Sequence, residues 1–70
     1  MFMEYYKFAG GSEYEYVRLD RAGRRAWLFD DDDLDWVEQD AYYTEIVWNG
    51  GGVPVTESEA LDFVGHLQSA

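Results

Sequence analysis

Aromatic-rich and alternating stretches predict three extended segments in the first 30 residues. Residues 2–8, FMEYYKF, are rich in aromatic side chains and end at the loop sequence AGGS. Residues 13–20, EYEYVRLD, and 24–30, RRAWLFD, alternate with a period of two, as half-buried strands do. Between them, Gly23 suits the positive-φ position of a short hairpin loop, and Asp20 can hydrogen-bond within that turn. We therefore expect an antiparallel hairpin.

The two faces of this hairpin differ in side-chain size. One face is predicted to carry the larger set, namely Tyr14, Tyr16, Arg18, Arg25, Trp27 and Phe29. The other face is predicted to carry the smaller aliphatic set, namely Val17, Leu19, Ala26 and Leu28. We expect the aliphatic face to pack against a helix and the aromatic face to lack an obvious cover.

The second half of the chain adds one strand and one helix to the prediction. The spacing of Leu34, Val37 and Ala41 indicates a short helical turn, and the alternation of residues 42–49, YYTEIVWN, indicates a strand. A helix over about 57–68 follows, because its sequence opens with the capping box T-x-x-E. Its apolar face is formed by Ala60, Phe63, Val64 and Leu67.

These elements predict one α+β domain over residues 1–70, in the order β-β-β-turn-β-α. We expect an antiparallel sheet of about four strands with one C-terminal helix packed on one face. A helix of about twelve residues is about 18 Å long and 10 Å wide, and four strands span roughly 15–20 Å. One helix can therefore cover only one face of the sheet.

Three arrangements would account for the aromatic face. The tyrosines can stand half-exposed with their hydroxyls in water. The acidic turn can fold back and place Trp36 over the open face. A second copy or another protein can pack there, since large apolar patches mark contact sites. We expect the third arrangement, in the form of a homodimer.

The charge balance favours a positively charged partner. The chain has 15 acidic residues against five lysines and arginines, giving a net charge of −10. Such a charge opposes direct binding to nucleic acid or to an anionic membrane. Seven of the carboxylates lie in residues 29–40, FDDDDLDWVEQD. This acidic segment is the best sequence candidate for contact with a basic partner, and a solvated turn is its simplest alternative.

The acidic segment has two more specific interpretations. A calcium loop of the EF-hand type fits Asp31, Asp33 and Asp35, but Trp36 then stands where glycine is required and Tyr42 where the bidentate glutamate is required. We therefore expect no metal and no cofactor. The other interpretation is a nucleic-acid mimic, whose carboxylates would occupy the basic groove of a DNA- or RNA-binding protein.

Four of the five cations, Arg18, Arg21, Arg24 and Arg25, cluster on the hairpin. Arginine forks suit phosphate or carboxylate, so an anion site is one interpretation. Neutralisation of neighbouring acids is the interpretation that we favour.

The sequence offers little for catalysis. It contains no cysteine and one histidine, His66, near the end of the predicted helix, where a cation suits the helix dipole. No nucleophile elbow or phosphate loop is present. The sequence predicts a protein that is not an enzyme. The N-terminus lacks the pattern of a secretory signal and no window matches a membrane span, so we expect a cytoplasmic location.

The last 30 residues or so, where GGGVPVTESEALDFV follows a strand containing YTEIVW, resemble the ending of many small uncharacterised acidic bacterial α+β proteins. Those proteins pair a short antiparallel sheet with a helix. The resemblance implies that fold and brings no activity or site residue with it.

The sequence thus predicts a non-enzymatic interaction or regulatory module that self-associates through its aromatic sheet face. The alternative is an acidic nucleic-acid mimic or an inhibitor of the immunity-protein type that binds a basic partner. The expected contact residues are Tyr14, Tyr16, Trp27, Phe29, Asp31, Asp32, Asp33, Asp35 and Trp36.

Overall fold

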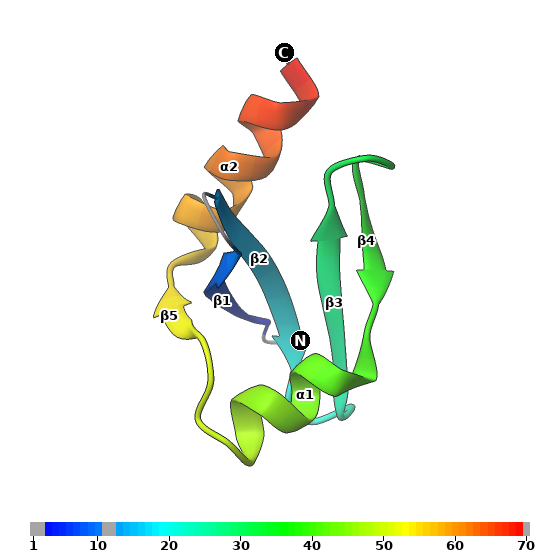
Figure 1. Ribbon diagram of the computed structural model, residues 1–70, viewed down its shortest axis with the longest axis vertical. Helices are drawn as coiled ribbons and strands as arrows, with labels where there is room; N and C mark the ends of the chain where they lie inside the picture. Colours follow the sequence, from blue (N-terminus) through cyan, green and yellow to red (C-terminus); the bar gives the residue numbers. More distant parts are fainter. Residues whose placement is uncertain (1–2, 11–12, 70) are drawn as a thin grey trace.

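The computed structural model describes residues 3–10 and 13–69, and over these ranges it forms a five-stranded sheet with two helices (Figure 1). The strands are β1 (Glu4–Gly10), β2 (Glu13–Asp20), β3 (Arg25–Asp30), β4 (Asp35–Glu38) and β5 (Val53–Val55). The helices are α1 (Asp40–Val47) and α2 (Glu57–Ser69). The predicted α+β class with an antiparallel sheet and a C-terminal helix is confirmed.

The strands lie in the order β4-β3-β2-β1-β5, and every neighbouring pair is antiparallel. The first four strands follow one another as hairpins. The chain then passes from edge strand β4 to the opposite edge through α1, which runs across the foot of the sheet in Figure 1. The short strand β5 contains Pro54, which suits an edge strand because proline has no backbone N–H to donate.

The predicted strand over residues 42–49 is wrong, because most of this segment is helix α1. Its apolar residues alternate, but Tyr42, Tyr43, Ile46 and Val47 also recur at helical spacing. The helix is selected by tertiary packing. Ile46 is buried against Val17, Leu19 and Ala26, with the other three helix side chains packed around them. The predicted helical turn around Val37 is also wrong, since that residue lies in β4.

The C-terminal helix α2 packs on the opposite face from the one expected. Its residue Ala60 is buried with Tyr5 and Tyr16, and Phe63 joins the same cluster. The capping box is confirmed, because the backbone N–H of Glu59 donates to Thr56 Oγ1 at 3.1 Å. The expectation that this helix covers the aliphatic face is wrong, since α1 already occupies that face.

The sheet therefore has a cover on each face, and the expected bare aromatic face is wrong. Tyr16 and Phe29 are only 7% and 6% exposed. Trp36, from β4, also packs over this face, with its ring 5.3 Å from Phe29 and 6.3 Å from Tyr5. A single helix would cover only one face of the sheet, but α1 covers the aliphatic face and α2 covers the aromatic face.

The β2–β3 hairpin forms where the sequence predicts it. The backbone N–H of Gly23 donates to Asp20 Oδ1 at 3.0 Å, as expected of this turn. The positive φ, however, is at Arg24 (57°) and not at Gly23. The turn thus places a non-glycine residue in the left-handed region.

Candidate binding cleft between β2 and β3

Strands β2 and β3 are paired over only part of their length. Their ladder runs from Asp20 and Arg25 to Val17 and Leu28. Beyond that point, residues 13–16 of β2 pair with β1, and residues 29–30 of β3 pair with β4. The two strands therefore diverge toward the hairpin tip at residues 31–34, as Figure 1 shows.

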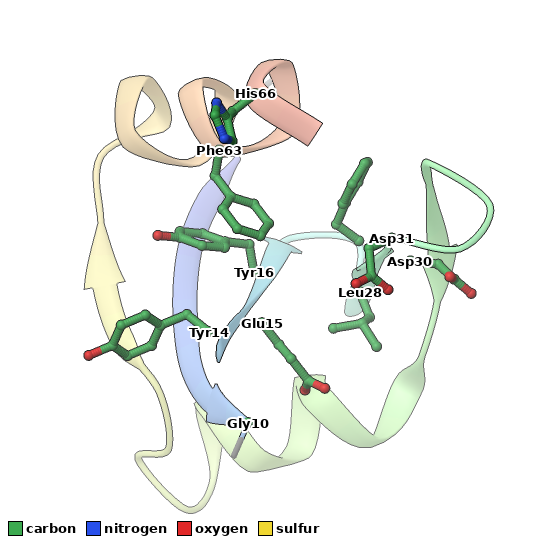
Figure 2. A pocket seen from close by; sticks show the side chains of 10 residues that line it. Gly10, Tyr14, Glu15, Tyr16, Leu28, Asp30, Asp31, Phe63 and His66 are labelled. Atoms are coloured by element: carbon green, nitrogen blue, oxygen red, sulfur yellow. The ribbon is translucent and has the colours of Figure 1, made fainter. Parts of the chain in front are cut away.

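A cleft of about 620 Å³ lies where the strands diverge. This volume falls within the roughly 300–1,000 Å³ of small-molecule sites. Figure 2 shows side chains of β2 on one side, side chains of β3 and the following turn on the other, and α2 above. The lining residues are Gly10, Tyr14, Glu15, Tyr16, Leu28, Phe29, Asp30, Asp31, Phe63 and His66.

The floor of the cleft is aromatic and fixed by packing. Tyr16 and Phe63 stack with ring centroids 4.4 Å apart and planes 29° apart. The Tyr16 hydroxyl donates to Glu59 Oε2 at 3.3 Å. Burial and the nearby Glu59 carboxylate raise the pKa of Tyr16, so its phenol stays neutral at ordinary pH. In contrast, Tyr14 is 54% exposed at the mouth.

The rim of the cleft is acidic. Asp30 Oδ1 accepts the backbone N–H groups of Asp32 at 2.8 Å and Asp33 at 3.2 Å, which shapes the turn between β3 and β4. Glu15 Oε2 accepts the hydroxyl of Tyr42 at 2.9 Å. Among the described residues, none of the rim carboxylates Glu15, Asp30 and Asp31 forms an ion pair.

The acidic turn contains a group of carboxylates that could hold a metal ion. The structure groups Asp30, Asp31 and Asp32, with candidate ligand oxygens all within 4.8 Å of one another. The EF-hand alternative had instead joined Asp31, Asp33 and Asp35. Asp31 and Asp32 are exposed, and Asp30 already accepts two backbone hydrogen bonds. Such a cluster is common at acidic turns without an ion.

Two of the four hairpin arginines neutralise neighbouring acids, as favoured from the sequence. Arg21 donates to both carboxylate oxygens of Glu4, at 2.8 and 2.9 Å. Arg25 does the same to Glu38, at 3.0 and 2.8 Å. These hydrogen bonds lower the pKa of Glu4 and of Glu38 below the ordinary carboxyl value.

Arg18 has a different environment. Its guanidinium lies 4.7 Å from the ring centre of Trp27 and 5.1 Å from that of Trp36. Its Nε is buried and has no hydrogen-bond partner among the described residues. The two tryptophans thus hold a cation within the fold, which is a structural role for Trp27 and Trp36.

The structure brings together only some of the contact residues expected from the sequence. Tyr14, Tyr16, Phe29 and Asp31 line the cleft, Asp32, Asp33 and Asp35 lie in or just after the exposed turn, and Trp27 and Trp36 surround Arg18. The cleft residues that sequence reasoning missed are Gly10, Glu15, Leu28, Asp30, Phe63 and His66. Phe63 and His66 lie in the predicted C-terminal helix, whose place beside the strands the sequence does not give. The alternation of polar and apolar residues does not indicate where the pairing between β2 and β3 ends.

Among the described residues, no helix is long and apolar enough to cross a membrane. No family model, curated protein or solved structure matches this chain.

Proposed function

We propose that this protein is a non-enzymatic binding module that accepts a positively charged segment of a partner protein in the cleft between β2 and β3. The observation that carries the proposal is the lining of the cleft. Aromatic rings form its floor, the carboxylates of Glu15, Asp30 and Asp31 form its rim, and no lysine or arginine lines it among the described residues.

This lining suits a lysine or arginine side chain of a partner. An aromatic ring attracts a cation over its face, and a carboxylate binds a guanidinium through paired hydrogen bonds. The net charge of −10 also attracts a basic partner at long range. Electrostatic attraction of this kind mainly accelerates association, and it weakens as salt is added.

Self-association through the aromatic face stays a prediction, but its premise is lost. Tyr16 and Phe29 are largely buried within one chain. Two copies would also repel each other, because each chain has a net charge of −10. Light scattering across a range of protein concentrations measures this separately from partner binding.

A hydrolase is the second candidate, because His66 lines the same cleft as the rim carboxylates. A histidine near carboxylates can act as a general base. We favour binding over hydrolysis because no serine, threonine or cysteine lines the cleft among the described residues. Turnover of generic esters that is lost in His66→Asn would favour the hydrolase instead.

The binding proposal is tested with a labelled arginine–serine peptide, and a glutamate–serine peptide of equal length serves as the control probe. The double variant Glu15→Gln/Asp31→Asn removes two rim charges. Its matched control, Glu45→Gln/Asp62→Asn, removes the same charge from exposed helix positions outside the cleft lining. We expect about tenfold weaker binding for the rim variant, or about 1.4 kcal/mol, and less than about twofold for the control.

Fluorescence anisotropy at low and at high salt gives the affinities. Equal losses in the two variants would show that only net charge matters and would remove the cleft from the proposal. Equal binding of the acidic peptide would refute the preference for a basic partner.

A further inference from the structure

The divergence of β2 and β3 leaves strand edges inside the sheet without a partner. Residues 13–16 of β2 pair with β1 on one side only, and residues 29–30 of β3 pair with β4 on one side only. Because backbone groups of successive strand residues point alternately to the two neighbouring strands, part of each edge faces the gap. Edges of this kind are templates for an added strand.

Two like charges oppose closure of the two edges. Continuing the register from Val17 and Leu28 would place Tyr16 opposite Phe29 and Glu15 opposite Asp30. Like charges directly opposite each other destabilise a strand pair. The paired ladder ends two positions before the one at which closure would bring the two carboxylates together.

A strand inserted into the gap would meet a different environment on each face. On the α1 face, one of its residues would lie between Glu15 and Asp30, where a cationic side chain neutralises both. On the α2 face, the adjacent residues would meet Tyr16, Phe29 and Phe63, which suit apolar side chains. Because strand side chains alternate between faces, the fitting sequence alternates basic and apolar residues.

We propose that the partner segment binds as an extended strand inserted between β2 and β3, with alternating basic and apolar residues. This inference rests on the proposed function and specifies the binding mode. The occupant is a segment of another protein, because this chain's own edge strands, DWVE and VPV, contain no cation and a second copy carries the same charge of −10.

Three capped peptides of about seven residues test the binding mode on the whole chain. The first alternates valine and lysine. The second has the same sequence with alternate amides N-methylated, which removes backbone donors and keeps every charge. The third has the same composition with its lysines in one block. We expect at least about tenfold weaker binding for the second and third peptides.

Amide hydrogen exchange by NMR locates the peptide. We expect slower exchange at the amides of Tyr14 and Tyr16, whose N–H groups face the gap, when the first peptide is bound. Protection at the outer strands β4 or β5 instead would overturn insertion, because the peptide would then be adding to an edge of the whole sheet.

The outcomes separate the two proposals. Equal binding of all three peptides, lost in Glu15→Gln/Asp31→Asn, would refute insertion and leave the acidic cleft as a binding site. A failure of all three to bind at low salt would refute both the basic partner and the strand mode. The variant Glu45→Gln/Asp62→Asn, which removes the same charge outside the cleft, serves as the charge control in each titration.

Discussion

At the residue scale, Gly50 and Gly52 in the loop before β5 are constrained by different physical effects. Gly50 and Gly52 both adopt positive φ, at 68° and 78°. A Cβ at Gly50 would meet no atom within 4 Å, whereas a Cβ at Gly52 would lie 2.8 Å from Phe8 Cζ. The first position is constrained by its backbone conformation alone, and the second by its packing as well.

We therefore expect Gly52→Ala to destabilise the fold more than Gly50→Ala. The unfavourable φ costs about 1 kcal/mol at either position. Overpacking against Phe8 adds about 1–3 kcal/mol at Gly52. Chemical denaturation of both variants measures the difference, and equal losses would mean that Phe8 moves aside without cost.

The exposure of the predicted contact residues also differs from one residue to the next. Tyr14 is exposed and Tyr16 is buried, although both point to the same face of β2. Tyr16 lies under Phe63 of α2, while Tyr14 lies one step nearer the mouth of the cleft. Alternation assigns a side chain to a face, but the extent of its cover depends on where the helix lies.

At the element scale, the role of like charges in the gap between β2 and β3 can be tested at one pair, Glu15 and Asp30. If repulsion between Glu15 and Asp30 keeps the strands apart, then Glu15→Lys converts that repulsion into attraction and extends the ladder. An opposite-charge cross-strand pair is worth about 0.2–1 kcal/mol. We expect slower hydrogen exchange at the Tyr16 amide, which would donate to the Phe29 carbonyl in an extended ladder, and a small gain in the free energy of unfolding.

Glu15→Gln is the matched control for this prediction. It removes the repulsion without adding an attraction, and its amide oxygen can still accept the Tyr42 hydroxyl. We expect the exchange rate of the Tyr16 amide in this variant to lie between those of the wild-type and the lysine variant. Unchanged exchange in Glu15→Lys would indicate that side-chain packing, and not charge, holds the strands apart.

Short elements were harder to predict than long ones for a physical reason. The spacing of Tyr42, Tyr43, Ile46 and Val47 is compatible with a strand and with a helix, and only burial on the aliphatic face selects the helix. The three-residue strand β5 has no periodicity of its own and exists because β1 offers a free edge. In contrast, α2 carries a capping box and a longer apolar face, so its position was predictable.

At the scale of the whole molecule, phenol hydroxyls tie the helix and strand layers together. Tyr5 Oη donates to Glu57 at 3.5 Å and Tyr16 Oη donates to Glu59 at 3.3 Å, both on α2. Tyr42 of α1 donates to Glu15 of β2 at 2.9 Å. For all three tyrosines, burial first and the neighbouring glutamate second raise the pKa above its ordinary value of 10.0.

These shifts predict a loss of stability at alkaline pH. Because the folded-state pKa is higher than the unfolded value, the stabilisation is complete below pH 10.0 and declines as the pH rises through the folded-state values. Denaturant midpoints measured below and above pH 10, with tyrosinate absorbance followed in parallel, check this. Tyr16→Phe removes the contribution of one tyrosine, so the stability of this variant should fall less steeply with rising pH than that of the wild-type. A midpoint that is flat across this range in the wild-type would contradict the prediction.

The sequence by itself determined the α+β class, the β2–β3 hairpin, the C-terminal helix and the acidic character of the turn after β3. Each of these follows from local chemistry, namely alternation, a turn residue, a capping box or a charge count. Only the tertiary structure decided which helix covers which face, and where the ladder between β2 and β3 ends. Those outcomes depend on packing and on charges such as Glu15 and Asp30, which lie far apart in the sequence and meet only when the strands are placed side by side.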